Sequence, residues 1–204
     1  MKRFFFTLVL LSVALTASAQ KFGVSGGMSL SRLEDVEDSG MAGFNLGVAY
    51  NIPLALGFAL QPELNYNVKG AKLADDVKYS AGYCELGLQA QWGVDLIVAK
   101  PFILFEPYIG GGLNNNLNYS DKSLKKNNWD FAKQLECGFA FGGGVEILYN
   151  LQISAKHFWA AGKLFKSDGS LNKELGDLYH DRISDVFDGD ANFAGTVISL
   201  TYFF

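Results

Sequence analysis

Apolar and polar residues alternate along most of the chain. In the stretch GFALQPELNYNVK, residues 57–69, Phe58 and Leu64 fall on one side of an extended strand, and Gln61 and Glu63 fall on the other. A repeat of two residues is typical of a strand with one buried face, whereas a helix repeats about every 3.6 residues. The sequence therefore predicts strands that carry one apolar and one polar face.

The same count along the rest of the chain predicts eight strands. They span approximately residues 21–31, 42–51, 57–69, 80–94, 101–114, 132–148, 151–162 and 191–204. Most of them reach the roughly 9–11 residues that a tilted strand needs to cross a bilayer.

The predicted connections are of two kinds. Those after the second, fourth and sixth strands are short, whereas those after the first, third, fifth and seventh are longer and polar. Short turns at one end and long loops at the other are typical of outer-membrane barrels, whose turns lie in the periplasm. We therefore expect an all-β fold, an eight-stranded antiparallel up-and-down transmembrane β-barrel with short periplasmic turns and long extracellular loops.

A water-soluble barrel of the lipocalin type is the main alternative, because it also has eight alternating strands. The polar face carries small residues that suit a narrow interior, namely Gly23, Gly27, Gly43, Gly47, Gly87, Gly110, Gly112, Gly138, Gly142 and Gly144. The apolar face carries Phe22, Phe44, Tyr50, Phe58, Tyr66, Trp92, Phe102 or Phe105, Phe139, Phe141 and Trp159. This aromatic bulk exceeds what an eight-stranded lumen holds and matches a lipid-facing surface with aromatic girdles, which favours the membrane barrel.

The N-terminus has the pattern of a secretory signal. Lys2 and Arg3 precede an apolar run, and Ala17 and Ala19 form a small-x-small cleavage site, so we expect residues 1–19 to be removed. The remaining residues 20–204 suit one domain, and because the removed segment holds two basic and no acidic residues, the net charge changes from −4 to −6. An acidic chain argues against a nucleic-acid partner.

The C-terminus ends on an apolar strand rather than a polar tail. Counting back from the end, Ile198, Leu200, Tyr202 and Phe204 share the lipid face. This ending resembles the C-terminal assembly signal of bacterial outer-membrane barrels, and the resemblance implies recognition by the barrel-assembly machinery.

Several segments resemble one family. They are GFNLGVAYNIPLALGFALQPELNYNVKGAK, YCELGLQAQW, PYIGGG, CGFAFGGGVEI and ISLTYFF. Together they resemble the PorT-like, porin-family outer-membrane β-barrel domain of Gram-negative bacteria, most tellingly in LQPELNYNVKGAK. The resemblance implies a location in the outer membrane and an eight-stranded barrel. One branch of that family is linked to protein secretion, and membership of that branch is left open.

Charged residues are predicted to point into the barrel. They are Glu63, Glu85, Glu106, Glu136 and Glu146, with Lys69 and Lys156 as the basic members. Charges in a narrow interior must pair or form hydrogen bonds, so a structural network is the favoured interpretation. If each lysine pairs with one glutamate, up to three carboxylates are left over, and a cation or proton path is the alternative.

The last long loop, residues 163–190, holds the only candidate for catalysis. His180 beside Asp181 could activate water or Ser184 at the outer rim, although no spacing here is specific. The same loop is rich in aspartate but lacks the closing glutamate of a calcium loop, so we expect no metal site and no cofactor. His157 is predicted on the apolar face of its strand.

The loop between the fifth and sixth strands is basic. Lys122, Lys125 and Lys126 lie near Trp129, and this grouping could contact lipopolysaccharide phosphates, although an ordinary polar loop is the simpler interpretation. Cys84 and Cys137 are predicted to stay unpaired, because a whole strand separates their strands.

Taken together, the sequence predicts a monomeric barrel of the cell outer membrane that is not an enzyme. Its expected role is structural or partner-binding through the extracellular loops, with a link to protein secretion as one form of that role. The expected partners are outer-membrane lipid, lipopolysaccharide, the barrel-assembly machinery and an extracellular or secretion-system protein. A narrow channel with an acidic lumen is the alternative, and a rim enzyme centred on His180 is the third hypothesis.

Overall fold

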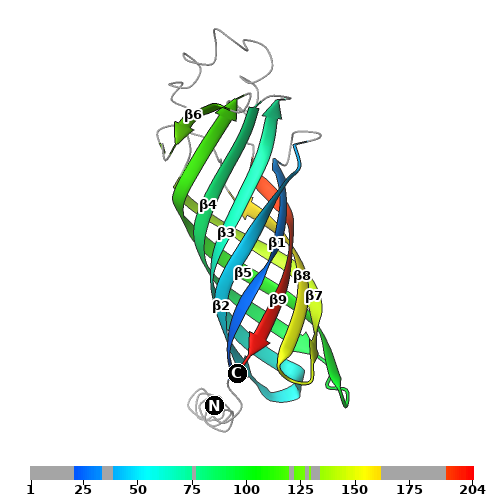
Figure 1. Ribbon diagram of the computed structural model, residues 1–204. Helices are drawn as coiled ribbons and strands as arrows, with labels where there is room; N and C mark the ends of the chain where they lie inside the picture. Colours follow the sequence, from blue (N-terminus) through cyan, green and yellow to red (C-terminus); the bar gives the residue numbers. More distant parts are fainter. Residues whose placement is uncertain are drawn as a thin grey trace, which may run out of the picture.

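The computed structural model shows a closed antiparallel barrel of eight strands with one short extra strand at its rim (Figure 1). It describes residues 21–33, 39–74, 77–119, 122–126, 129, 134–161 and 192–204. The barrel strands are β1 (Lys21–Leu33), β2 (Met41–Pro53), β3 (Phe58–Ala74), β4 (Val77–Gly93), β5 (Ala99–Tyr119), β7 (Leu135–Ile147), β8 (Leu151–Ala161) and β9 (Phe193–Phe203). Among these residues, no helix has the length and hydrophobicity to cross a membrane.

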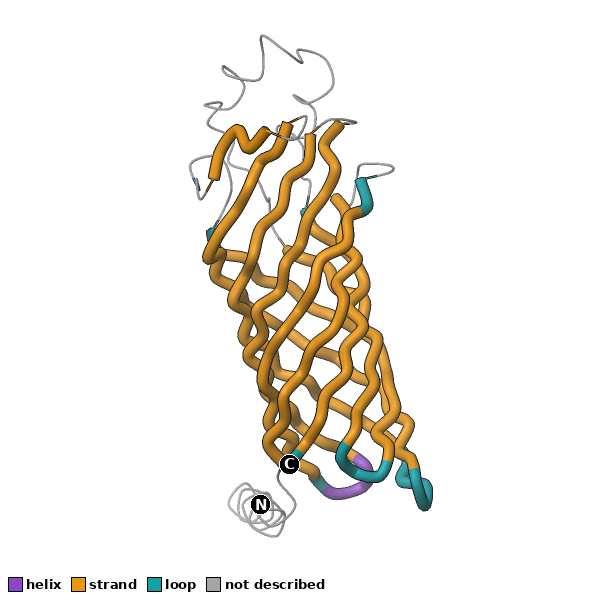
Figure 2. The backbone as a smooth tube through the Cα atoms, in the orientation of Figure 1, coloured by secondary structure: helices purple, strands orange, loops and turns teal. Residues whose placement is uncertain are grey.

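The strands follow one another around the barrel in chain order. Each pairs with its neighbour in the sequence, β5 pairs with β7, and β9 returns to pair with β1 from Gly23 opposite Phe203 to Leu33 opposite Phe193. The extra strand β6 (Lys122–Lys126) pairs with the end of β5 alone. The predicted eight-stranded up-and-down barrel is confirmed, and Figure 2 shows the continuous wall of strands.

Three strands run further toward the loop end than the sequence predicts. The segment after residue 69, expected to be a loop, continues β3 to Ala74, and β4 already begins at Val77. The hairpin persists because pairing continues through Gly70 opposite Ser80 and Lys72 opposite Lys78. In Figure 1, β3, β4 and β5 rise above the other strands and form a wall on one side of the rim.

The opposite end of the barrel has short turns, as predicted. The connection from β2 to β3 contains the short 3-10 turn η1 (Ala55–Gly57), in which Leu56 and Gly57 have positive φ. Between β7 and β8, Leu148 and Tyr149 also have positive φ, at 51° and 62°. This connection has only three residues, 148–150, and the Asn150 amide donates to the Ile147 carbonyl at 3.2 Å, so β8 returns directly beside β7.

The turn between β7 and β8 also holds both ends of the described barrel. Lys21 Nζ donates to the Tyr149 carbonyl and lies 2.7 Å from Glu146 Oε1. At the other chain end, the Phe203 amide donates to the Asn150 carbonyl at 2.7 Å, and Asn150 Nδ2 donates back to the Phe203 carbonyl at 2.9 Å. We call this group of contacts the terminal clasp.

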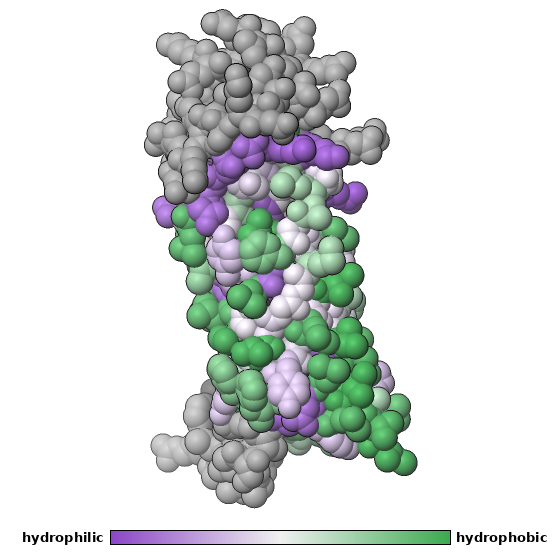
Figure 3. Space-filling view, in the orientation of Figure 1, coloured by the Kyte–Doolittle hydropathy of each residue, from purple (hydrophilic) through white to green (hydrophobic). Residues whose placement is uncertain are grey.

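The outer face of the barrel is apolar, as the membrane interpretation requires. Figure 3 shows hydrophobic residues covering the middle and lower part of the visible face, with hydrophilic residues gathered near the loop end. Aromatic residues cluster close to the turn end, at Phe22, Tyr50, Phe58, Trp92, Tyr202 and Phe204. The sequence left open whether Phe102 or Phe105 faces the lipid. In the structure, Phe105 faces outward and Phe102 is buried inside.

Candidate functional site

The lumen of the barrel is filled with polar and charged side chains. Strand alternation points them inward, and closure of the barrel removes them from solvent; they include Asn45, Asn51, Gln61, Glu63, Asn67, Lys69, Glu85, Gln89, Gln91, Glu106, Glu136 and Gln152. Glycines make room for the larger groups. A Cβ atom at Gly87, for example, would lie 2.9 Å from the carboxyl carbon of Glu106. The interior is therefore a packed polar core, as expected for a barrel of this strand number.

One ion cluster joins three strands in the half of the lumen nearer the turn end, which we call the lower half. Lys156 of β8 donates to Glu106 Oε2 of β5 at 2.5 Å and to Glu63 Oε2 of β3 at 3.3 Å. Glu63 also accepts from Gln61 Nε2 at 2.7 Å and from Asn65 Nδ2 at 3.0 Å. We call Lys156, Glu63 and Glu106 the lower triad; every carboxylate in it has a cation or amide partner.

A second cluster lies nearer the loop end. Lys69 Nζ of β3 contacts Glu136 of β7 and lies 2.6 Å from Glu85 Oε1 of β4. Tyr108 donates to Glu136 Oε1 at 3.1 Å, and the ammonium group also lies 4.4 Å from the ring centre of Phe158. Lys69, Glu85 and Glu136 form the upper triad, in which the lysine side chain is 1% exposed, against 11% for Lys156 of the lower triad.

The remaining predicted lumen residue, Glu146, pairs with a lysine that sequence reasoning missed. Glu146 lies at the turn end of the barrel, 2.7 Å from Lys21. Strand parity places Lys21 on the same inner face as Ser25, so alternation could have identified this first residue of β1 as lumen-facing. The expectation that up to three carboxylates lack a lysine partner is wrong, because Lys69 and Lys156 each contact two glutamates and Lys21 contacts the fifth. Five carboxylates against three ammonium groups still leave an excess of two negative charges.

Above the upper triad, the lumen is filled by apolar side chains. Leu33, Val77, Leu117 and Phe193 are fully or almost fully buried, and Phe193 stacks on Tyr79 with ring centres 6.2 Å apart. The aromatic ring of Trp129, predicted to stand beside basic loop residues, instead packs edge-on against Tyr83 inside the barrel, 6.0 Å between centres.

The other predicted sites are placed as follows. Ile198, Leu200, Tyr202 and Phe204 all face outward, each about half exposed or more, and their role as an assembly signal stays a prediction. Both cysteines are free, and β5 lies between their strands. The candidates His180, Asp181 and Ser184 lie outside the described residues, as does the rest of the 163–190 loop.

Comparisons with known proteins agree with this architecture. The family model described as outer membrane protein beta-barrel domain matches residues 5–171. Among solved structures, Neisserial surface protein A matches with a TM-score of 0.50 and 11% identity, covering 90% of this chain and 97% of that one. At this identity the likeness shows the fold alone.

Two further matches are crystal structures of Ail, the attachment invasion locus protein of Yersinia pestis. The first has 13% identity and a TM-score of 0.46, covering 90% of this chain and 98% of that one. The second, in complex with the heparin analogue sucrose octasulfate, has 14% identity and a TM-score of 0.46, covering 91% and 99%. No curated protein matches the chain.

Proposed function

Because the chain belongs to the family of outer-membrane β-barrel domain proteins, we propose that it is a plugged membrane anchor that binds a protein partner through its extracellular end. The family places the barrel in the outer membrane. The partner is an extracellular or secretion-system protein, and the working surface is the loop end of the barrel. The barrel acts as a monomer, and residues 1–19 are a signal sequence removed before Gln20.

The single observation that carries the proposal is the ion-paired lumen, in which each of the five glutamates contacts an ammonium group. A channel needs a continuous wet path, and a porin-like interior is wide and water-filled. Here both triads and the Lys21–Glu146 pair place ammonium groups directly on the carboxylates that could have attracted cations. The apolar layer around Phe193 then fills the lumen above them. These features favour an anchor over the alternative of a narrow cation channel.

The loop end offers the partner surface. The β3–β4 hairpin extends past the rest of the rim and carries outward, exposed Lys72 and Lys78 on opposite strands. Paired strands hold a projecting surface in one geometry, which lowers the entropy lost on binding. The turn end, by contrast, is compact, with the terminal clasp occupying it.

Two measurements test this function. Purified full-length protein in a planar bilayer is expected to show no steady conductance, and reproducible cation-selective channels would favour the acidic-lumen alternative. A photo-reactive amino acid at Lys78 is expected to cross-link a specific protein in cells, whereas the same probe at exposed Leu56 on the turn end serves as the matched control. Equal cross-linking at both positions, or none at Lys78, would contradict a partner surface at the loop end.

We also propose that the chain is PorT-like and that its partner-binding role serves protein secretion. The support is the resemblance carried by LQPELNYNVKGAK, which forms most of β3. Deletion of the gene is then expected to change the set of secreted proteins without lowering the permeability of the outer membrane to small solutes. We propose no catalytic role, and loss of a measured activity in a His180→Ala variant would reopen that hypothesis.

A further inference from the structure

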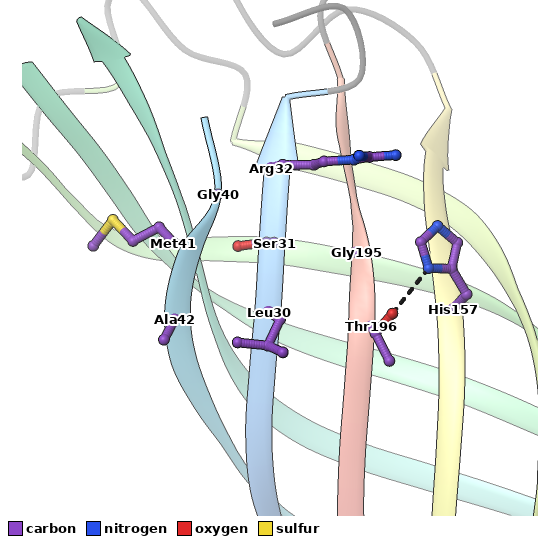
Figure 4. A pocket seen from close by; sticks show the side chains of 9 residues that line it. All are labelled: Leu30, Ser31, Arg32, Gly40, Met41, Ala42, His157, Gly195 and Thr196. Carbon is purple, nitrogen blue, oxygen red and sulfur yellow. Dashed lines mark hydrogen bonds between the residues drawn. The ribbon is translucent and has the colours of Figure 1, made fainter. Parts of the chain in front are cut away.

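A notch lies on the outside of the barrel near the loop end, apart from the lumen and the β3–β4 hairpin. It has a volume of about 450 Å³ and is formed by residues of β1, β2, β8 and β9 (Figure 4). Arg32 stands one residue before the end of β1, and His157 lies four residues before the end of β8. The notch therefore lies where the strands leave the membrane on the extracellular side.

Strand register explains why the surface is hollow at this point. Ala42, Leu30, Thr196 and His157 are direct cross-strand partners, so they form one row across β2, β1, β9 and β8. The middle of this row is low, because the small side chain of Thr196 lies between Leu30 and His157. Figure 4 shows this floor on β9 with the larger residues on either side.

Two nitrogen-bearing side chains converge over the floor. His157 Nδ1 lies 3.0 Å from Thr196 Oγ1, and its ring packs edge-on against Trp159 with centres 4.6 Å apart. These contacts fix the ring, and its second nitrogen points toward the level of Arg32 in Figure 4. The Arg32 side chain, whose cross-strand partner is Ala194, crosses β9 above Gly195 and ends on the side of His157 in the same view. Among the described residues, none forms an ion pair with Arg32.

This combination has the chemistry of a phosphate site on a lipid-facing wall. A guanidinium group matches phosphate oxygens with two parallel hydrogen bonds, and a fixed imidazole N–H adds a third. Directly below the notch, toward the membrane centre, Met28 and Ile198 are opposite one another and about half exposed. An apolar strip under a cationic pair fits a molecule with a phosphate head and acyl chains, whereas a free anion would leave the strip unused.

We propose that this notch binds lipopolysaccharide of the outer leaflet through a lipid A phosphate. Arg32 and His157 donate to the phosphate, and an acyl chain lies along Leu30, Met28 and Ile198. The inference is independent of the protein partner proposed above, because it concerns a different face of the barrel and a lipid ligand.

The test measures retention of lipid A by the full-length protein in detergent, using native mass spectrometry. Wild-type protein is expected to retain one copy of bisphosphorylated lipid A and much less of the dephosphorylated form. Arg32→Gln and His157→Phe are each expected to weaken retention about tenfold or more, since hydrogen bonds to charged groups contribute at least that factor. His157→Phe keeps a ring against Trp159, and the gel shift on heating confirms that each variant is folded.

Lys100→Gln is the control, because it removes one positive charge from β5 at the turn end, away from both the notch and the β3–β4 hairpin. Its lipid A retention is expected to equal that of the wild type. Equal losses for Lys100→Gln and Arg32→Gln would mean diffuse attraction and would overturn the site. Undiminished retention by the Arg32→Gln/His157→Phe double variant would do the same. If inorganic phosphate binds in a way that depends on Arg32 and His157, and lipid A does not bind, the notch is a free-anion site and the lipid assignment is refuted.

Discussion

Replacing Lys156 with methionine tests whether the lower triad stabilises the barrel. The ammonium group is the cation shared by Glu63 and Glu106, at 3.3 and 2.5 Å, and both carboxylates are almost fully buried. Breaking a buried pair by removing one partner costs about 3–5 kcal/mol, because a charge is left uncompensated. Lys156→Met leaves two carboxylates without a cation, so we expect the free energy of unfolding to fall by at least about 3 kcal/mol.

The assay is reversible denaturant unfolding in lipid vesicles, read by tryptophan fluorescence. The matched control is Lys100→Met, since Lys100 lies 3.8 Å from an exposed Asp95 carboxylate. Such a surface pair contributes about 0–1 kcal/mol, and the control should change little. A rescue variant adds Glu63→Gln and Glu106→Gln to Lys156→Met. These two substitutions remove the uncompensated negative charges and should recover most of the lost stability.

The reasoning is refuted if Lys156→Met is as stable as the wild type, or if the two glutamine substitutions fail to improve it.

Three further results are expected. Deleting Phe204 should sharply lower outer-membrane levels of the protein, as measured by fractionation and blotting, and unchanged levels would show that the ending is no assembly signal. Mass spectrometry should find no bridge between Cys84 and Cys137, because β5 separates their strands by two spacings of about 4.8 Å each. Gly27→Val should prevent the heat-dependent gel shift of a closed barrel, since a Cβ atom there overlaps the Ile198 carbonyl across the β1–β9 seam; a normal shift would contradict this register.

The sequence predicts which face a residue occupies, but not its height along the barrel. Alternation placed Glu63 and Lys156 in the lumen, yet nothing in the pattern says that these residues, far apart in sequence, lie at one level. Their meeting depends on the register of every strand pair between β3 and β8, which is set jointly by closure and turn geometry. For this reason one lysine shared by two glutamates could not be predicted, whereas the inward direction could.

The polar ends of some strands were also not predicted from the sequence. The residues between Lys69 and Ala74 do not continue the apolar outer face, because Lys72 is exposed on the outside while Ala71 is fully buried on the inside. Lys122–Lys126 form β6 by pairing with β5, which alternation does not reveal. The notch at Arg32 likewise needs the β1–β9 register, since parity alone does not place Arg32 opposite Ala194 and Leu30 opposite Thr196.

The terminal clasp makes this barrel a candidate for circular permutation. Lys21 and Phe203 meet at one turn, and the Phe204 amide donates to the Phe22 carbonyl at 2.8 Å, so a short linker can join Lys21 to Phe204. Opening the chain between Ala74 and Val77 instead would place both new ends at the loop end of β3 and β4. Because the linker also removes a free C-terminus at Phe204, such a permuted barrel would be refolded in detergent, where it would carry fused peptides at its loop end.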